Sequence, residues 1–214
     1  MHIQGVIFDN DGTLVDSEHT AARLLHSMLE EHAVILSADE VLRRFRGVQF
    51  ALLMAQLREE HPHFEPEPFT RVYRERSMAS FRQATAPMPG ALEFVRDLKV
   101  PCCVASNGPR DKIETTLHSA GLLQYFTGMI VSAYEVNAWK PAPQLILAGA
   151  ELMGLEPRHC LLVEDSHAGV QAGLAAGTQV VGYGVDTDFS AYEGMPGFHV
   201  AKDYSALATW LRVG

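Results

Sequence analysis

GVIFDNDGTLVDSE, residues 5–18, decides the fold of this chain. It begins with a short apolar run that has the length and composition of a buried strand. Two carboxylates, Asp9 and Asp11, follow that run directly, and Gly12 permits a tight turn after them. Side chains two residues apart on an extended chain point the same way, so both carboxylates should reach one place. Because such a pair repels itself unless it holds a proton or a cation, this strand end is a candidate site for chemistry.

Short apolar runs alternate with segments of helical period through the second part of the sequence, which is typical of units built around a parallel sheet. Further strands are expected at CCVASN, GMIVSA, CLLVED, TQVVGYG and FHVAKD (residues 102–107, 128–133, 160–165, 178–184 and 198–203). Helices are expected over 109–121 and 143–154, and the small residues of 166–177 suit close helix–sheet packing. We predict an α/β fold with a Rossmann-like parallel sheet core and helices on both faces.

The pattern changes between about residues 17 and 83, where no strand is expected. Four segments there have helical character: HTAARLLHSMLEEH, ADEVLRRF, FALLMAQLREEH and PFTRVYRERSMASF (residues 19–32, 38–45, 50–61 and 68–81). The break HPHFEPEP separates the third from the fourth. We therefore predict an inserted all-α domain over residues 16–84, with the sheet domain formed by residues 1–15 and 85–214.

The composition excludes several classes of protein. A chain of 214 residues with 47% hydrophobic and 20% charged residues can bury a full core. The formal net charge of −9 argues against nucleic acid as a partner, because binding it requires a basic face. Three cysteines, two of them adjacent, favour a reducing compartment over a disulfide framework. Without a leader-like N-terminus or a run of about 18 apolar residues, we expect a cytoplasmic protein that does not bind membranes.

Four predicted strands end at, or shortly precede, polar side chains. In open parallel sheets, reactive groups collect where the carboxyl ends of the strands meet the loops. The set consists of Asp9 with Asp11, Ser106 with Asn107, Lys140 after the GMIVSA strand, and Glu164 with Asp165. Their coincidence at one edge of the sheet is much more specific than any one of them alone.

The stretches DNDGT, VASN, WKP and VEDS resemble, in order, the four motifs of the haloacid dehalogenase-like superfamily. The resemblance extends over the whole chain and includes a helical cap between the first two motifs, as in subfamily I of that family. Within the family, FDNDGTLVDSE, VASNGP and WKPAP are most similar to the bacterial phosphatase type that acts on 6-phosphogluconate. The resemblance implies a monomeric hydrolase of phosphoric monoesters that acts on a small phosphorylated sugar or sugar acid.

A bound magnesium ion would relieve the repulsion between the carboxylates of Asp9 and Asp11. Oxygen-only ligands point to Mg²⁺, which binds through one or two carboxylates together with substrate phosphate. We expect Asp9 and Asp165 to supply side-chain oxygens, and the resemblance implies that Asp11 adds its backbone carbonyl. Glu164 and Thr13 are expected to lie behind these ligands and to hold them in place.

The resemblance also implies the catalytic roles. Asp9 attacks phosphorus and forms an aspartyl-phosphate. Asp11 protonates the leaving alkoxide and later deprotonates the attacking water, since one carboxyl can alternate as acid and base. Lys140 supplies positive charge to the phosphoryl oxygens, while Ser106 and the backbone N–H near Asn107 donate hydrogen bonds to them.

Arg46 is a candidate for substrate binding in the insert, where it follows two other arginines and precedes a glycine. A loop of the cap would bring it to the distal anionic group of the substrate. The alternative is that these arginines form a solvated helix face.

Three other functions share part of this pattern. A β-phosphoglucomutase shares the four motifs and the cap, but it carries a histidine where Ala21 falls and a cap arginine where Phe50 falls, which favours hydrolysis here. Haloacid dehalogenases lack the second aspartate, so Asp11 argues against that activity. A receiver-like phospho-acceptor module also combines acidic residues, Mg²⁺, a hydroxyl and a lysine, but its acceptor closes a later strand than the first.

Overall fold

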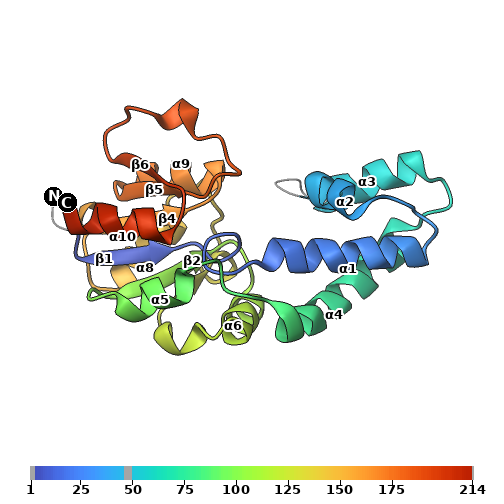
Figure 1. Cartoon of the computed structure of the whole chain (residues 1–214), viewed down its shortest axis with the longest axis horizontal. Coiled ribbons are helices and arrows are strands. Elements are labelled where there is room, and N and C mark those ends of the chain that lie inside the picture. Colours follow the sequence, from blue (N-terminus) through green and yellow to red (C-terminus); the bar gives the residue numbers. More distant parts are fainter. Residues whose placement is uncertain (1–2, 46–49, 214) are drawn as a thin grey trace. The chain divides into compact units, whose positions relative to one another are not determined.

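The computed structural model describes residues 3–45 and 50–213 (Figure 1). The chain divides into two compact units, Met1–Val15 with Ala86–Gly214, and Asp16–Thr85. We call the first the sheet unit and the second the helical unit, and each is described by itself. Among the described residues, no helix has the length and apolar character to cross a bilayer.

The sheet unit is built on six parallel strands. These are β1 (Gly5–Phe8), β2 (Cys102–Ser106), β3 (Ile130–Ser132), β4 (Cys160–Glu164), β5 (Gln179–Tyr183) and β6 (Phe198–Ala201). Their order in the sheet is β3-β2-β1-β4-β5-β6. The chain therefore builds one half outward from β1, returns to β4 beside β1, and builds the other half. The strand order reverses between β1 and β4, and in open sheets of this kind ligands bind at such a reversal, outside the carboxyl ends of the strands. The predicted fold class is confirmed.

Helices cover both faces of this sheet. They are α5 (Ala91–Asp97), α6 (Arg110–Ser119), the short α7 (Ala133–Val136), α8 (Gln144–Leu152), α9 (His167–Ala176) and α10 (Tyr204–Val213), with single 3₁₀ turns at Leu123–Tyr125, Pro157–His159 and Ser190–Tyr192. Val6 and Phe8 of β1 pack with α5, α6 and α10, whereas Ile7 packs with α8 and α9 on the other face. This alternation follows from the period of two along a strand. Burial on both faces explains why the strands are apolar throughout.

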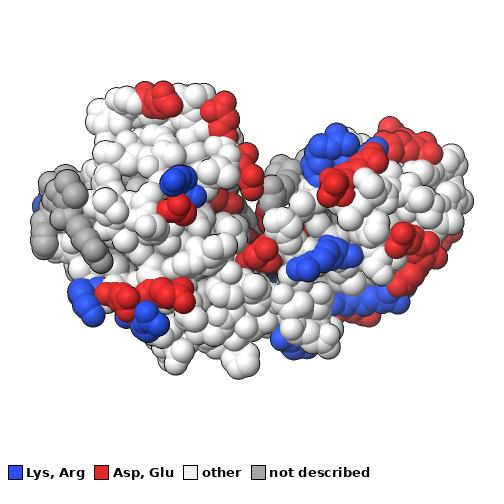
Figure 2. All heavy atoms as spheres, in the orientation of Figure 1, with Lys and Arg blue, Asp and Glu red and all other residues white. Residues whose placement is uncertain are grey.

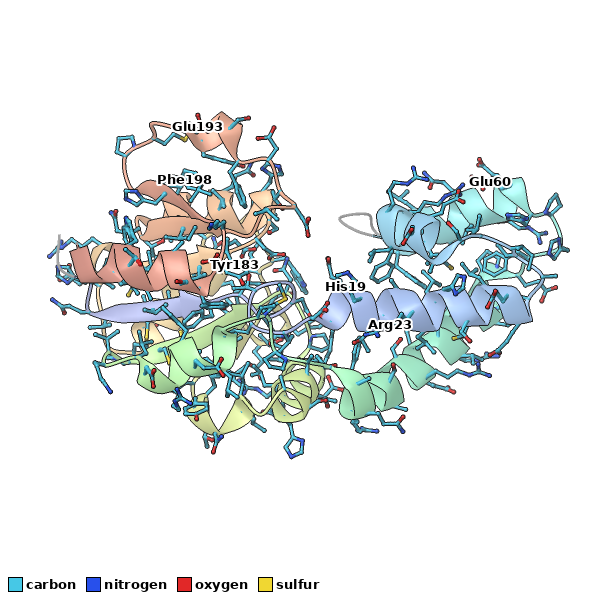
Figure 3. The ribbon with its side chains drawn as sticks, viewed as in Figure 1. His19, Arg23, Glu60, Tyr183, Glu193 and Phe198 are labelled. Atoms are coloured by element: carbon cyan, nitrogen blue, oxygen red, sulfur yellow. The ribbon has the colours of Figure 1, made fainter. Side chains whose placement is uncertain are left out.

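The last strands extend the first of these two cores. Tyr183 of β5 lies on the face that α10 covers (Figure 3), and its ring centroid is 4.8 Å from that of Tyr204. The Tyr204 hydroxyl donates to the carbonyl of Thr13 at 2.8 Å. The C-terminal helix thus fixes the turn that follows β1, where the candidate site begins.

In the helical unit, the described residues form four helices around a core of their own. They are α1 (Ser17–Glu31), α2 (Ala38–Phe45), α3 (Phe50–Glu60) and α4 (Pro66–Ala84). Apolar side chains from all of them are buried together, Leu25, Val41, Leu57 and Phe69 among them. The Tyr73 ring stacks on Phe50 with centroids 4.8 Å apart, and its hydroxyl donates to the carbonyl of Ala21 at 3.2 Å. The expected helices are confirmed, although α4 begins at Pro66, inside the predicted break, because proline suits the first turn of a helix.

Exposed ion pairs connect neighbouring helices of the helical unit. In Figure 2, the Arg side chains of this unit lie in small groups among Asp and Glu side chains. Arg44 pairs with Glu60 at 2.7 Å and Arg76 pairs with Glu31 at 2.8 Å. Along α1, the Arg23 side chain donates to the carbonyl of His19 one turn earlier (Figure 3). Exposed pairs of this kind contribute little to stability, so the apolar core holds the unit together.

The chain leaves and rejoins the sheet unit at neighbouring residues. Val15 pairs with Pro87 in an antiparallel bridge. Next to it, the N–H of Met88 donates to the carbonyl of Leu14 at 2.9 Å. The two segments that flank the helical unit are therefore tied to each other within the sheet unit.

Candidate active site

The candidate site lies at the carboxyl ends of β1 and β4, where the strand order reverses. Phe8 is paired in register with Val163, and the N–H of Asp9 donates to the carbonyl of Val163 at 3.0 Å. Asp9 and Glu164 therefore follow paired residues of two neighbouring strands. Register in the sheet thus brings together two carboxylates that are far apart in the sequence.

A buried lysine joins these two carboxylates. The Nζ atom of Lys140 donates to Asp9 Oδ1 at 2.5 Å and to Glu164 Oε2 at 2.7 Å. All three side chains are almost fully buried. The backbone N–H of Lys140 donates to Oδ1 of Asn107 at 2.9 Å, so the loop after β2 holds the loop that carries the lysine.

The charges in this cluster shift one another's pKa. Burial raises the pKa of Asp9 to about 7, against the lowering effect of Lys140, and the charges of Glu164 and Asp11 add to the rise. Burial by itself would lower the pKa of Lys140, but the charges of Asp9 and Glu164 outweigh it, and the pKa rises above its ordinary value. Lys140 therefore stays protonated and does not balance all of the surrounding carboxylates, which favours the binding of a cation.

Three carboxylates are close enough to hold such a cation. Among the described residues, Asp9, Glu164 and Asp165 offer oxygen atoms that all lie within 4.8 Å of one another. Both oxygens of Glu164 already have partners, since Oε2 accepts from Lys140 and Oε1 accepts from the N–H and hydroxyl of Ser166 at 3.0 and 2.8 Å. Asp9 and Asp165 are therefore the better candidates for direct ligands, with Glu164 fixing the lysine.

The Asp165 side chain is held by the turn after β1. Thr13 Oγ1 donates to Asp165 Oδ1 at 3.2 Å, while the hydroxyl of Thr187 donates to the Asp165 carbonyl at 2.6 Å. Gly12 lies directly against this carboxylate: a Cβ atom at Gly12 would be 2.1 Å from Asp165 Oδ2. The close approach of backbone and carboxylate explains why this position needs glycine.

Substitution of Gly12 with alanine should displace the Asp165 carboxylate. The φ angle of Gly12 is +80°, a conformation that costs a residue with a side chain about 1–2 kcal/mol, and the overlap with Asp165 adds to that. We expect G12A to weaken Mg²⁺ binding at least about tenfold, since a ligand is moved from its place. Titration with Mg²⁺ and urea unfolding measure the two effects.

Gly128 provides the matched control for this substitution. Its φ angle is +74°, but a Cβ atom there would meet nothing within 4 Å. G128A should therefore show the backbone strain without the loss of Mg²⁺ affinity. Equal Mg²⁺ affinity in G12A and wild type would contradict the assignment of Asp165.

Ser106 ends β2, the other neighbour of β1. It is buried, and its Oγ accepts from the N–H of Gly108 at 3.1 Å. The carbonyl of Gly108 in turn accepts from the hydroxyl of Ser132 at 2.7 Å, at the end of β3. A hydroxyl that accepts this bond can still donate its own hydrogen, as a phosphate-binding role requires.

The carboxylate of Asp11 turns toward α6. Its Oδ2 accepts from Nζ of Lys112 at 2.8 Å, and its Oδ1 accepts from Nδ2 of Asn10 at 3.4 Å. Lys112 is a site residue that the sequence interpretation missed. The signal available for it was its place in the first turns of the helix after Ser106, which begins at the same edge of the sheet.

Direct contacts connect most of the predicted site residues. Direct bonds or short distances link Asp9, Thr13, Asn107, Lys140, Glu164 and Asp165, while Asp11 follows β1 and Ser106 ends the neighbouring strand β2. The Asn107 side chain has a contact that was not expected, since its Oδ1 accepts from the backbone N–H of Lys140, while donation from the backbone N–H near Asn107 stays a prediction. Arg46 lies outside the described residues.

Comparison with known proteins places this geometry in context. The sequence model of the haloacid dehalogenase-like hydrolases matches residues 3–177. The 6-phosphogluconate phosphatase of Escherichia coli (strain K12) is 35% identical over 179 residues, which cover 83% of this chain and 81% of that protein. Hexitol phosphatase A of the same organism is 31% identical over 192 residues, covering 88% and 86%.

A solved structure is similar over almost the whole chain. It is a haloacid dehalogenase-type hydrolase from Deinococcus radiodurans R1, crystallised with bound phosphate and sodium. Its TM-score is 0.85 and its sequence identity 30%, and the match covers 99% of this chain and 96% of that one. The likeness therefore spans both units of the fold.

Proposed function

This chain belongs to the haloacid dehalogenase-like hydrolase family and is a phosphoric monoester hydrolase, and we propose that it is a Mg²⁺-dependent phosphatase of a small phosphorylated sugar or sugar acid. The resemblance drawn from the four motifs is confirmed. The observation that carries the proposal is the buried Lys140 between Asp9 and Glu164, with Asp165 beside them. The proposed nucleophile, a fixed ammonium and the proposed metal site meet there at the ends of the neighbouring strands β1 and β4.

The substrate class is supported by the relatives. Two of them carry names that denote phosphatases of a sugar acid phosphate and of hexitol phosphates. We propose that residues 16–85 form a cap that selects among such substrates, with Arg46 contacting a distal anionic group. The net charge of −9 suits a small anion held by a few focused cations better than a polyanion.

The donor set suits Mg²⁺. Carboxylate oxygens are its preferred protein ligands, and Asp9 and Asp165 would supply them, with the backbone carbonyl of Asp11 as a third. When bound, the ion neutralises charge on the phosphoryl oxygens and lets an anionic ester approach an anionic carboxylate. Thr13 and Glu164 would fix the geometry, Thr13 through its bond to Asp165 and Glu164 through its bond to Lys140.

The residues of the chain divide the reaction into two displacements. An oxygen of Asp9 attacks phosphorus and forms an aspartyl-phosphate while the bond from phosphorus to the sugar oxygen breaks. Asp11 gives its proton to that leaving oxygen, then takes a proton from the water that attacks the aspartyl-phosphate, which releases phosphate and restores Asp9. Lys140 and Ser106 stabilise the charge on the phosphoryl oxygens throughout.

Phosphate release from a panel of phosphorylated sugars, polyols and sugar acids tests this function. We expect turnover with Mg²⁺ and at least about a 100-fold loss in a chelator, because the ion lowers the barrier by several kcal/mol. Readdition of Mg²⁺ should restore the activity. In thermal unfolding, Mg²⁺ at 100 times its dissociation constant should stabilise the wild type by about 2.7 kcal/mol, and D165N much less.

Two outcomes would contradict the proposal. If the protein converts β-glucose 1-phosphate to glucose 6-phosphate faster than it releases phosphate, it is a mutase. If it forms a stable aspartyl-phosphate and does not turn over, it is a phospho-acceptor module. Ala21 and Phe50 stand where a mutase carries a histidine and a cap arginine, and this favours hydrolysis over the mutase reaction.

A further inference from the structure

We propose that Lys112 is a positioning residue, which holds the carboxylate of Asp11 against α6 so that it serves as acid and base and not as a side-chain ligand of the metal. The inference rests on the proposed function, since it concerns the step in which Asp11 protonates the leaving group. It assigns a role to a helix that the catalytic scheme otherwise leaves without one.

Both oxygens of the Asp11 carboxylate are held from the same side. Lys112 Nζ donates to Oδ2 at 2.8 Å, and Asn10 Nδ2 lies 3.4 Å from Oδ1. The Asn10 amide is fully buried and also donates to Oγ1 of Thr116 at 3.1 Å. Since Lys112 and Thr116 are four residues apart, they share one face of α6. Lys112 therefore supports Asp11 directly, and Thr116 supports it indirectly through the Asn10 amide.

The helix that provides this support is firmly anchored. Ile113 and Leu117 of α6 are fully buried in the core under the sheet. At its start, the Arg110 guanidinium pairs with Glu135 of α7 and donates to the carbonyl of Ile130 at 2.8 Å. A side chain projecting from such a helix has a fixed origin, so Lys112 can hold a carboxylate in a defined place.

The position of Asp11 is separated from the metal cluster. Among the described residues, the acidic group with oxygens within 4.8 Å of one another contains Asp9, Glu164 and Asp165, and does not contain Asp11. A carboxylate bound directly to a dication would lose more basicity than one beside a single ammonium. Lys112 holds the Asp11 carboxylate with such an ammonium, and both side chains are about a quarter exposed.

Substrates with different leaving groups can test whether Lys112 supports the acid role of Asp11. A sugar alkoxide needs a proton as it leaves, whereas an aryl oxide is stable enough to leave without one. General acid catalysis contributes typically about 10²–10⁴-fold, and Lys112 supports it through its bond to Asp11. Loss of Lys112 should therefore impair the first displacement for sugar phosphates and spare it for aryl phosphates.

The experiment compares kcat/KM for a sugar phosphate and for an aryl phosphate in K112M, which keeps most of the length of the side chain and removes its charge. We expect kcat/KM to fall about 10–100-fold for the sugar phosphate and less than about threefold for the aryl phosphate. With the aryl phosphate, K112M should show a burst of aryl alcohol and then slow turnover, since hydrolysis of the aspartyl-phosphate still needs Asp11 as a base. K112R should restore most of the sugar phosphate activity.

Lys99 is the matched control, since it is exposed and precedes β2, away from the carboxyl ends of the strands. K99M should match the wild type with both substrates. Equal losses of kcat/KM for both substrates in K112M, a rise in KM alone, or no change would each overturn the inference while the proposed function stands. If the wild type itself releases phosphate from neither substrate, the proposed function fails and the inference falls with it.

Discussion

Replacement of Asp9 by asparagine is expected to lower phosphate release by at least about 10³-fold, because the amide cannot attack phosphorus. The change preserves the shape of the side chain, so circular dichroism should show an unchanged fold. Steady-state release of phosphate from an aryl phosphate measures the effect, and an aryl phosphate is chosen because its first displacement needs no proton from Asp11. Turnover equal to that of the wild type would remove Asp9 from the nucleophile role.

D9N should also change how the stability of the protein depends on pH, and the burial of Asp9 sets the direction of that change. The pKa of Asp9 rises from 3.8 to about 7 in the folded metal-free chain, mainly because burial disfavours the charged form. The Asp9 carboxyl thus binds its proton more tightly in the folded state than in the unfolded state. This tighter binding contributes its whole stabilisation below pH 3.8, and the contribution is lost as the pH rises through 7. The amide that replaces this carboxyl in D9N has no proton to lose. In a chelator, the stability of D9N relative to the wild type should therefore increase from pH 5 to pH 8.

Replacement of Lys140 by methionine should produce the largest loss of stability. The variant leaves Asp9 and Glu164 buried without the ammonium that lies 2.5 and 2.7 Å from them. Removal of one partner from a buried ion pair costs about 3–5 kcal/mol. Urea unfolding of the metal-free protein measures this cost, and phosphate release should fall at least about 100-fold, since the charge that faces the phosphoryl group is lost.

A second substitution separates charge from packing. The double variant K140M/E164Q removes one of the stranded carboxylates, and it should recover part of the stability but none of the activity. The exposed Lys99 again offers a control, since K99M should be as stable as the wild type. If K140M unfolds at the wild-type urea concentration, the ion pair does not stabilise the site as the geometry indicates.

Much of the site could be predicted because the carboxyl ends of parallel strands meet at one edge. Asp9 and Lys140 are 131 residues apart, yet they form a direct ion pair. Apolar runs flanked by turn residues located the strands within a residue or two. Alternation along an extended chain placed Asp9 and Asp11 on one side, but β1 ends at Phe8, before either residue. Beyond that end, the turn at Gly12 and the charge of Lys112 decide where the Asp11 carboxylate lies.

The elements that escaped prediction are short or carry an ordinary composition. Helix α5 has seven residues, too few for a helical period to stand out. Helix α10 follows closely after β6, and no helix was expected over its residues. Lys112 lies among other charged residues of α6, where a lysine is usually solvated, and nothing local distinguishes it from them. Its role depends on a contact with a residue 101 positions away.

The antiparallel bridge between Val15 and Pro87 has a consequence for how this protein can diversify. The segment of residues 16–85 begins and ends at positions that are paired with each other, so it is inserted into the sheet unit as a long loop would be. It can therefore change in length or sequence without shifting the register of the strands. Mutations in residues 16–85 can therefore accumulate while the reactive groups of the sheet stay in place. If residues 16–85 select the substrate as proposed, evolution can change the substrate while the reaction stays the same.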